Sequence, residues 1–101
     1  MSIFRLSSRA EEDFLQIGAF TIDRWGVDQT DRYLTQLETC CRQIADMPAM
    51  GHVANEVRPG LRRIEHGRHV IFYRELSDGV LVVRILHDRM LAEHQPFDDE
   101  E

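Results

Sequence analysis

The fold is decided by the stretch HVIFYRELSDGVLVVRILH, residues 69–87. Within it, residues 69–74 and 80–87 form two runs rich in β-branched and aromatic residues, and each run has the length of a β-strand. Ser77-Asp78-Gly79 between them has the composition of a tight turn. The stretch therefore predicts a β-hairpin.

The segments around this hairpin add further strands. Residues 61–66 form another run of strand length, and Gly67-Arg68 separates it from residue 69. Glycine supplies the positive φ that a two-residue hairpin often needs. Residues 3–6 are a predicted first strand. The sequence thus predicts three strands in a meander and a fourth from the start of the chain.

Two amphipathic helices are predicted between the first strand and the meander. Ser8-Arg9-Ala10-Glu11 has the spacing of a capping box, so a helix is expected to begin there, and Gly26 is a natural stop. Asp28 is expected to cap a second helix that continues until Pro48. The short connection between them predicts an antiparallel helical hairpin.

The predicted element order, β-α-α-β-β-β, defines an α+β fold. The helical hairpin packs on one face of a mainly antiparallel four-stranded sheet. Residues 80–86 are apolar at nearly every position. Either this strand is buried on both faces of the sheet, or one sheet face awaits a partner.

Length and charge limit the possible functions. The chain has 101 residues and all twelve of its bases are arginines, which excludes a Schiff-base or P-loop lysine. The net charge of -6 argues against direct nucleic-acid binding. Residues 51–91 carry seven arginines and five acids, whereas residues 92–101 carry five acids and no base. We expect one domain over residues 1–94 and an acidic tail over residues 95–101.

Several features indicate a cytoplasmic protein. Cys40 and Cys41 are adjacent in a predicted helix, where neighbouring side chains diverge, so no disulfide framework is expected. The sequence opens without a signal-peptide pattern, and no apolar run approaches the roughly 20 residues of a membrane span. No cofactor is expected.

The histidines are interpreted structurally. His66 and His69 become neighbours across the predicted turn, and without a third ligand an exposed pair is favoured over a metal site. His87 ends the last strand, where a hydrogen bond to the backbone or to a carboxylate is favoured over a catalytic role.

Short motifs occur in a fixed order along the chain: Arg5-Leu6-Ser7, Arg24-Trp25-Gly26, Met47-Pro48, Leu61-Arg62-Arg63, the run at 69–74 and Arg84-Ile85-Leu86-His87-Asp88-Arg89-Met90. This ordered set, from about residue 4 to residue 94, resembles the ParE branch of the RelE/ParE superfamily of toxin–antitoxin toxins. The resemblance implies a toxin that inhibits DNA gyrase by binding and is held inactive by a ParD-type antitoxin.

The relatives in that superfamily that cleave ribosome-bound mRNA define the main alternative. Such an endoribonuclease needs a base, an acid and cations for the phosphorane charge. The chain has no lysine to supply such a cation, so it is poorly equipped for this catalysis. The candidate catalytic residues are then His87, Arg68, Arg74 and Arg84. A non-toxic module that only docks an antitoxin is a second alternative.

The antitoxin is expected to contact two groups of side chains. The first is apolar and belongs to the helical hairpin, where a leftover groove would receive an amphipathic helix. The second is a set of arginines. Of these, Arg74 and Arg84 each either pair within the chain, with Glu65, Glu75 or Asp88, or hold a carboxylate of the partner. Trp25 is more simply interpreted as a core plug that locks the hairpin. The expected contacts are Phe20, Trp25, Leu34, Leu37, Arg62, Arg63, Arg74, Arg84 and Arg89.

Overall fold

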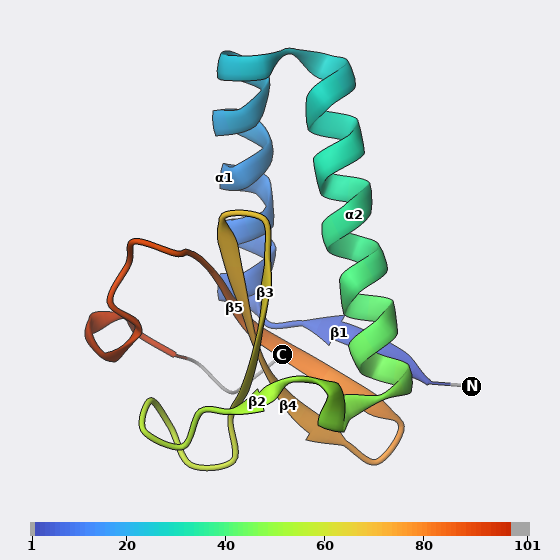
Figure 1. Ribbon diagram of the computed structural model, residues 1–101, viewed down its shortest axis with the longest axis vertical. Helices are drawn as coiled ribbons and strands as arrows, with labels where there is room; N and C mark the ends of the chain where they lie inside the picture. The colour runs from blue at the N-terminus through green and yellow to red at the C-terminus, as the bar shows by residue number, and fades with distance from the viewer. Residues whose placement is uncertain (1, 98–101) are drawn as a thin grey trace.

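The computed structural model describes residues 2–97 and consists of a helical hairpin packed on a five-stranded sheet (Figure 1). The strand order is β1-β5-β4-β3-β2. β1 pairs parallel with β5, and every other pairing is antiparallel. The strands are β1 (Ile3–Leu6), β2 (His52–Val53), β3 (Arg62–His66), β4 (His69–Leu76) and β5 (Gly79–His87).

The predicted α+β class and the three-strand meander are confirmed, but the predicted count of four strands is wrong. The additional strand, β2, has two residues and pairs with Arg62 and Arg63 of β3. Two residues show no alternating pattern, so this strand exists only through its pairing with β3.

The helices are α1 (Ser8–Trp25) and α2 (Val27–Asp46), and they confirm the predicted hairpin. The cap of α1 is Ser7 rather than Ser8. The Ser7 hydroxyl accepts from the Ala10 N–H at 3.0 Å and donates to the Val83 carbonyl at 2.8 Å, so the same side chain begins the helix and fixes it to β5.

Gly26 alone joins the two helices. Its φ of +84° ends α1, as predicted, and its N–H donates to the Ile22 carbonyl. Because α2 begins directly at Val27, the expectation that Asp28 caps it is wrong; Asp28 lies in the first turn. The helix ends at Asp46, before the short 3-10 helix η1 (Pro48–Met50).

Apolar residues are buried on both faces of the sheet. One core lies between the helices and the sheet and contains Leu37, Ile44, Tyr73 and Val82 among others. The opposite core includes Leu61, Phe72 and Val83. Of the two interpretations of the apolar strand at 80–86, burial on both faces is therefore correct: every residue from Gly79 to Leu86 is buried.

The chain itself covers the second face. Residues 54–61 supply Ala54, Val57 and Leu61, and the C-terminal segment, which contains the 3-10 helix η2 (Ala92–His94), supplies Ala92 and Phe97. Phe97 packs edge-on against Phe72 with ring centroids 5.4 Å apart. Phe97 was assigned to the predicted acidic tail of residues 95–101; the last four residues of that tail, 98–101, lie outside the described residues.

Two sequence features receive simple structural explanations. Gly67 has a φ of +57° in the turn between β3 and β4, as the predicted hairpin requires. Cys40 and Cys41 are free and buried in α2, and burial raises the pKa of the Cys41 thiol to about 12. Within residues 2–97, no helix is long and apolar enough to span a membrane.

Candidate functional site

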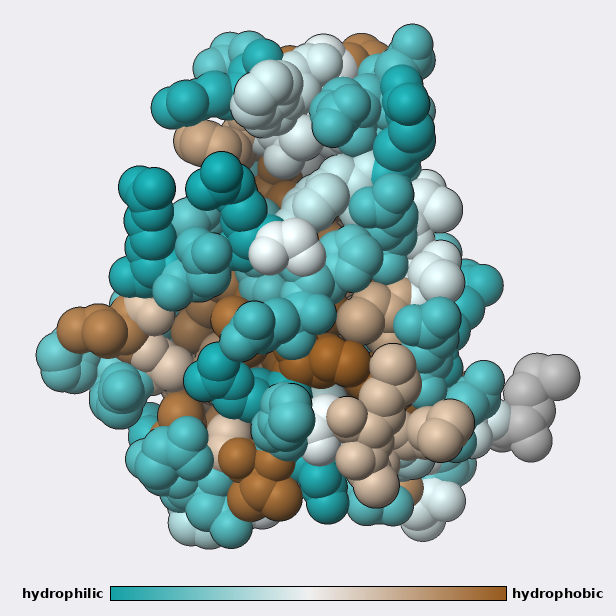
Figure 2. Space-filling view, in the orientation of Figure 1, coloured by the Kyte–Doolittle hydropathy of each residue, from teal (hydrophilic) through white to brown (hydrophobic). Residues whose placement is uncertain are grey.

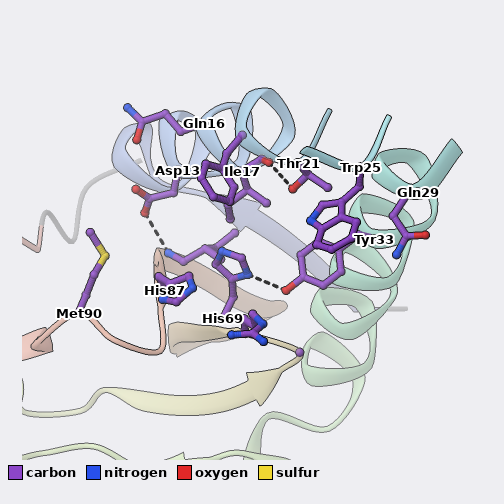
Figure 3. A pocket seen from close by; sticks show the side chains of 14 residues that line it. Asp13, Gln16, Ile17, Thr21, Trp25, Gln29, Tyr33, His69, His87 and Met90 are labelled. Carbon is purple, nitrogen blue, oxygen red and sulfur yellow. Dashed lines mark hydrogen bonds between the residues drawn. The ribbon is translucent and has the colours of Figure 1, made fainter. Parts of the chain in front are cut away.

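A groove of about 460 Å³ lies between the helical hairpin and one end of the sheet (Figure 3). Its walls come from α1, α2, the turn between β3 and β4, and the end of β5 with the loop that follows. The lining side chains include Ile17, Phe20, Thr21, Trp25, Tyr33, Arg68, His69, Ile85, His87 and Met90.

The apolar wall of the groove is formed by α1 near the tip of the hairpin. Phe20 is 58% exposed and Trp25 is 68% exposed. The helices project beyond the sheet (Figure 1), so no strand lies beneath Trp25 and the interpretation of this residue as a core plug is wrong. In the view of Figure 2 the hairpin is mostly hydrophilic and brown surface gathers over the lower half of the molecule.

The two leucines expected beside these aromatics lie deeper. Leu34 is half-buried and packs against the core between the helices and the sheet. Leu37 is fully buried in that core and is not available to a partner in this conformation. This corrects the expectation that Leu37 contacts an antitoxin: the face of α2 on which it lies is covered by the sheet.

The polar end of the groove is built around Tyr33 and His69. The Tyr33 hydroxyl lies 2.6 Å from His69 Nδ1 and also donates to the His66 carbonyl at 3.3 Å. Burial raises the pKa of Tyr33. Burial, followed by the nearby His87, lowers the pKa of His69, so this imidazole favours its neutral form.

His87 lies next to His69, because the two residues pair across β4 and β5. Their rings meet edge to face with centroids 5.5 Å apart. His87 Nδ1 accepts from the Arg89 N–H at 3.2 Å and lies 3.0 Å from a carboxylate oxygen of Asp88. The expectation that His87 is hydrogen-bonded to the backbone or to a carboxylate is thus confirmed for the backbone, through the Arg89 N–H.

Arg84 is the most constrained of the candidate arginines. Its Nε and Nη2 donate to the two carboxylate oxygens of Asp13 at 2.8 and 2.9 Å, and its Nη1 donates to the Pro96 carbonyl at 2.7 Å. Intramolecular pairing is therefore correct, but the expected partners Glu65, Glu75 and Asp88 are wrong. Each nitrogen of this buried guanidinium has an acceptor within the chain, so the side chain is not available to a partner or to a substrate in this conformation.

The other expected arginines are spread over the molecule. Arg62 donates to the Gly51 carbonyl at 2.9 Å, and Arg63 pairs with Glu65 at 3.0 Å. Arg74 donates to the Pro59 carbonyl at 2.8 Å, beside the loop that covers the second sheet face. Arg89 is exposed after β5. The structure therefore does not gather these arginines into one cluster.

The candidate nuclease set is also divided. His87 and Arg68 both line the groove. Arg74 pairs with Leu81, five residues along β4 from the His69–His87 pair, which is about 17 Å at roughly 3.4 Å per residue. With Arg84 held by Asp13, two of the four predicted catalytic side chains are absent from the groove.

The predicted proximity of His66 and His69 is confirmed, because the two residues pair across the Gly67-Arg68 turn. Among residues 2–97, no group of three metal-ligating side chains is placed to hold an ion. Sequence reasoning missed that His69 points to Tyr33 of α2. An i, i+3 histidine pattern carries no information about a tyrosine 36 positions away.

These features define an α+β protein with an open groove beneath a helical hairpin. The sequence matches, over residues 4–92, the family described as ParE toxin of type II toxin-antitoxin system, parDE. The chain belongs to this family.

Similar proteins agree with this assignment. Toxin ParE1 of Mycobacterium tuberculosis (strain H37Rv) is 41% identical over 90 residues, which cover 88% of this chain and 92% of the relative. Toxin ParE1 of Caulobacter vibrioides is 39% identical over 92 residues, which cover 91% of this chain and 95% of the relative. A solved structure described as the chromosomal ParDE TA system from P. aeruginosa has the same fold, with a TM-score of 0.72 at 15% identity over 86% of this chain and 96% of that chain.

Proposed function

We propose that the chain inhibits DNA gyrase by binding, without chemistry of its own, and that a ParD-type antitoxin neutralises it by covering the helical hairpin and the groove. Membership of the parDE toxin family supports two parts of this proposal, namely that the chain is a toxin and that its antitoxin is of the ParD type. The solved structure with the same fold is itself described as a ParDE system.

The non-enzymatic part of this proposal rests chiefly on the Arg84–Asp13 pair. A cation that stabilises a phosphorane must be free to contact the phosphate. Arg84 instead donates three hydrogen bonds within the chain, and Arg74 lies along the sheet, away from His87. The chain also has no lysine that would replace them.

Antitoxin binding is assigned to the exposed apolar wall. Phe20 and Trp25 are large, exposed and adjacent to an open groove, which is the arrangement of a docking site for an amphipathic helix. The guanidinium of Arg24 lies 4.8 Å above the Phe20 ring and adds positive charge beside this wall. Arg62, Arg63, Arg74 and Arg89 are proposed as peripheral contacts only.

Expression of the chain alone tests this function. We expect growth arrest with a DNA-damage response, and co-expression of the ParD-type antitoxin restores growth. Growth arrest with cleaved ribosome-bound mRNA and no DNA damage would contradict the proposal. Normal growth without any antitoxin would indicate a non-toxic module.

One observation favours the ribonuclease as second candidate. The groove places His69, His87, Arg68 and Tyr33 together, and two imidazoles with a cation are able to perform acid–base chemistry on a phosphodiester. Inactivation of His69 and His87 separates the two functions: it would abolish mRNA cleavage, whereas inhibition of gyrase needs no proton transfer.

A further inference from the structure

The polar end of the groove contains a cluster of titratable side chains that inhibition by binding does not explain. Four polar side chains line this end of the groove (Figure 3). They are Tyr33 from α2, Arg68 from the β3–β4 turn, His69 from β4 and His87 from β5. Tyr33 and His69 are joined at 2.6 Å, and His69 and His87 are in ring contact. Four separate elements therefore converge on one small polar site.

This end of the groove contains both signs of charge, and Arg68 is the cation that is open to a ligand. Asp13 lines the groove, but its carboxylate accepts from the Arg84 guanidinium and from the Ile85 N–H, so its charge is compensated. Asp88 contacts His87 at 3.0 Å. Arg68 is exposed, and within residues 2–97 its guanidinium has no carboxylate partner. The groove thus offers Arg68 as a cation beside two imidazoles, with the Asp88 carboxylate already in contact with one of them.

We propose that this end of the groove is a carboxylate-binding site: it receives an acidic side chain of the antitoxin segment, whose neighbouring apolar residue packs against Phe20 and Trp25, and the complex takes up a proton at His69 or His87. This inference rests on the proposed ParD-type partner. The occupant follows from the two ends of the groove, one of which is apolar while the other offers Arg68 and two imidazoles.

Proton uptake follows from the surroundings of His69. The groups that face it are Tyr33 from α2, His66 from β3, His87 from β5, Asp88 from the following loop and Asp13 from α1. In the free chain burial lowers the pKa of His69 and so favours its neutral form. A carboxylate placed against the imidazoles favours the charged form, so binding and protonation assist one another.

A phosphate of RNA or DNA would carry the same sign of charge. We favour the carboxylate because the chain has a net charge of -6, which opposes the approach of a polyanion. Most of the groove is also apolar, with Ile17, Phe20 and Ile85 in its walls.

Phenylacetate is the probe for a first experiment, because it joins an aromatic ring to one carboxylate. The histidine ring signals of the full chain are followed by NMR from pH 5 to 8 with phenylacetate, with uncharged 2-phenylethanol, or with phenyl phosphate. We expect phenylacetate to raise the pKa of His69 or His87, 2-phenylethanol to leave both unchanged, and exposed His52 in β2 to stay unaffected as an internal control. No shift with phenylacetate, or a shift with phenyl phosphate alone, would overturn the proposal.

Calorimetry with the ParD-type antitoxin is the second experiment. Comparison of two buffers with different ionisation enthalpies counts the protons taken up at pH 7.5. We expect affinity to rise as the pH falls from 7.5 to 6.0, by at most about tenfold per pH unit for one coupled proton. The double variant H69Q/H87Q should remove this dependence, H52Q should retain it, and R68Q at an exposed position should weaken binding without unfolding the chain. A tight complex without proton uptake would overturn this inference and leave the proposed function intact, whereas absence of any complex would contradict the proposed partner.

Discussion

Arg84 and Asp13 are 71 positions apart in the sequence and form a bidentate ion pair, with Nε–Oδ2 at 2.8 Å and Nη2–Oδ1 at 2.9 Å. The pair fixes the first turns of α1 against β5, and Asp13 also accepts from the Ile85 N–H at 2.9 Å. The third Arg84 bond, to the Pro96 carbonyl, ties in the C-terminal segment. One side chain therefore connects a helix, the most buried strand and the end of the described chain.

Removal of Arg84 leaves the Asp13 carboxylate buried without its counter-ion. We expect R84A to lower the free energy of unfolding by about 3–5 kcal/mol, the usual cost of breaking a buried pair. The matched control is R63A, which removes the exposed pair with Glu65 and should cost at most about 1 kcal/mol. Urea unfolding measures both; equal losses would show that the buried pair does not stabilise the fold.

Stability should depend on pH through His69. Burial lowers the pKa of this imidazole in the folded state below its ordinary value of about 6.5, so the unfolded chain binds more protons in the interval between the two values. The contribution of neutral His69 to the stability of the fold is complete above about pH 6.5 and is lost as the pH falls through the pKa of His69 in the folded state. Thermal unfolding from pH 7.5 to 5.0 should show a falling Tm. H69Q should flatten this slope relative to H52Q, and an unchanged slope would contradict the assignment to His69.

The C-terminal aromatic should stabilise the second core. F97A removes an edge-to-face contact with Phe72 and a ring over which the Arg58 guanidinium lies at 5.5 Å, and we expect a loss of about 1–3 kcal/mol in urea unfolding. F20A truncates the same side chain at a 58% exposed position and should cost much less. A larger loss for F20A than for F97A would contradict the described packing.

Trp25 should serve binding rather than folding. W25A is expected to weaken the antitoxin complex by at least about 2 kcal/mol, or roughly thirtyfold, while the Tm stays almost unchanged. Leu15 provides the control, because it is 73% exposed on the same helix and does not line the groove. If calorimetry gives the same affinity for W25A and L15A, the antitoxin does not use this wall.

Local patterns in the sequence predict most of the fold. The strands at residues 69–87 and the helix stop at Gly26 follow from side-chain chemistry within a few residues. The position of the α1 cap at Ser7 instead of Ser8 does not follow from local chemistry, because the hydrogen bond between Ser7 and Val83 decides between the two serines. β2 escapes prediction because two residues form a strand only next to β3.

The site is less predictable, because it depends on distances between elements. The exposure of Trp25 follows from how far the hairpin projects past the sheet, and the partner of Arg84 comes from a helix that is remote in sequence. The Tyr33–His69 contact joins α2 to β4 in the same way. Residue types indicated which side chains mattered, while only the assembled fold indicated which of them meet.

Inhibition of gyrase is measured directly by a supercoiling assay with purified toxin and DNA gyrase, with an mRNA cleavage assay on programmed ribosomes run in parallel. We predict loss of supercoiling that the ParD-type antitoxin reverses, the same loss for an H69Q/H87Q double variant that remains folded, and intact mRNA. Unimpaired supercoiling together with mRNA cleavage that disappears in H69Q/H87Q would contradict this prediction.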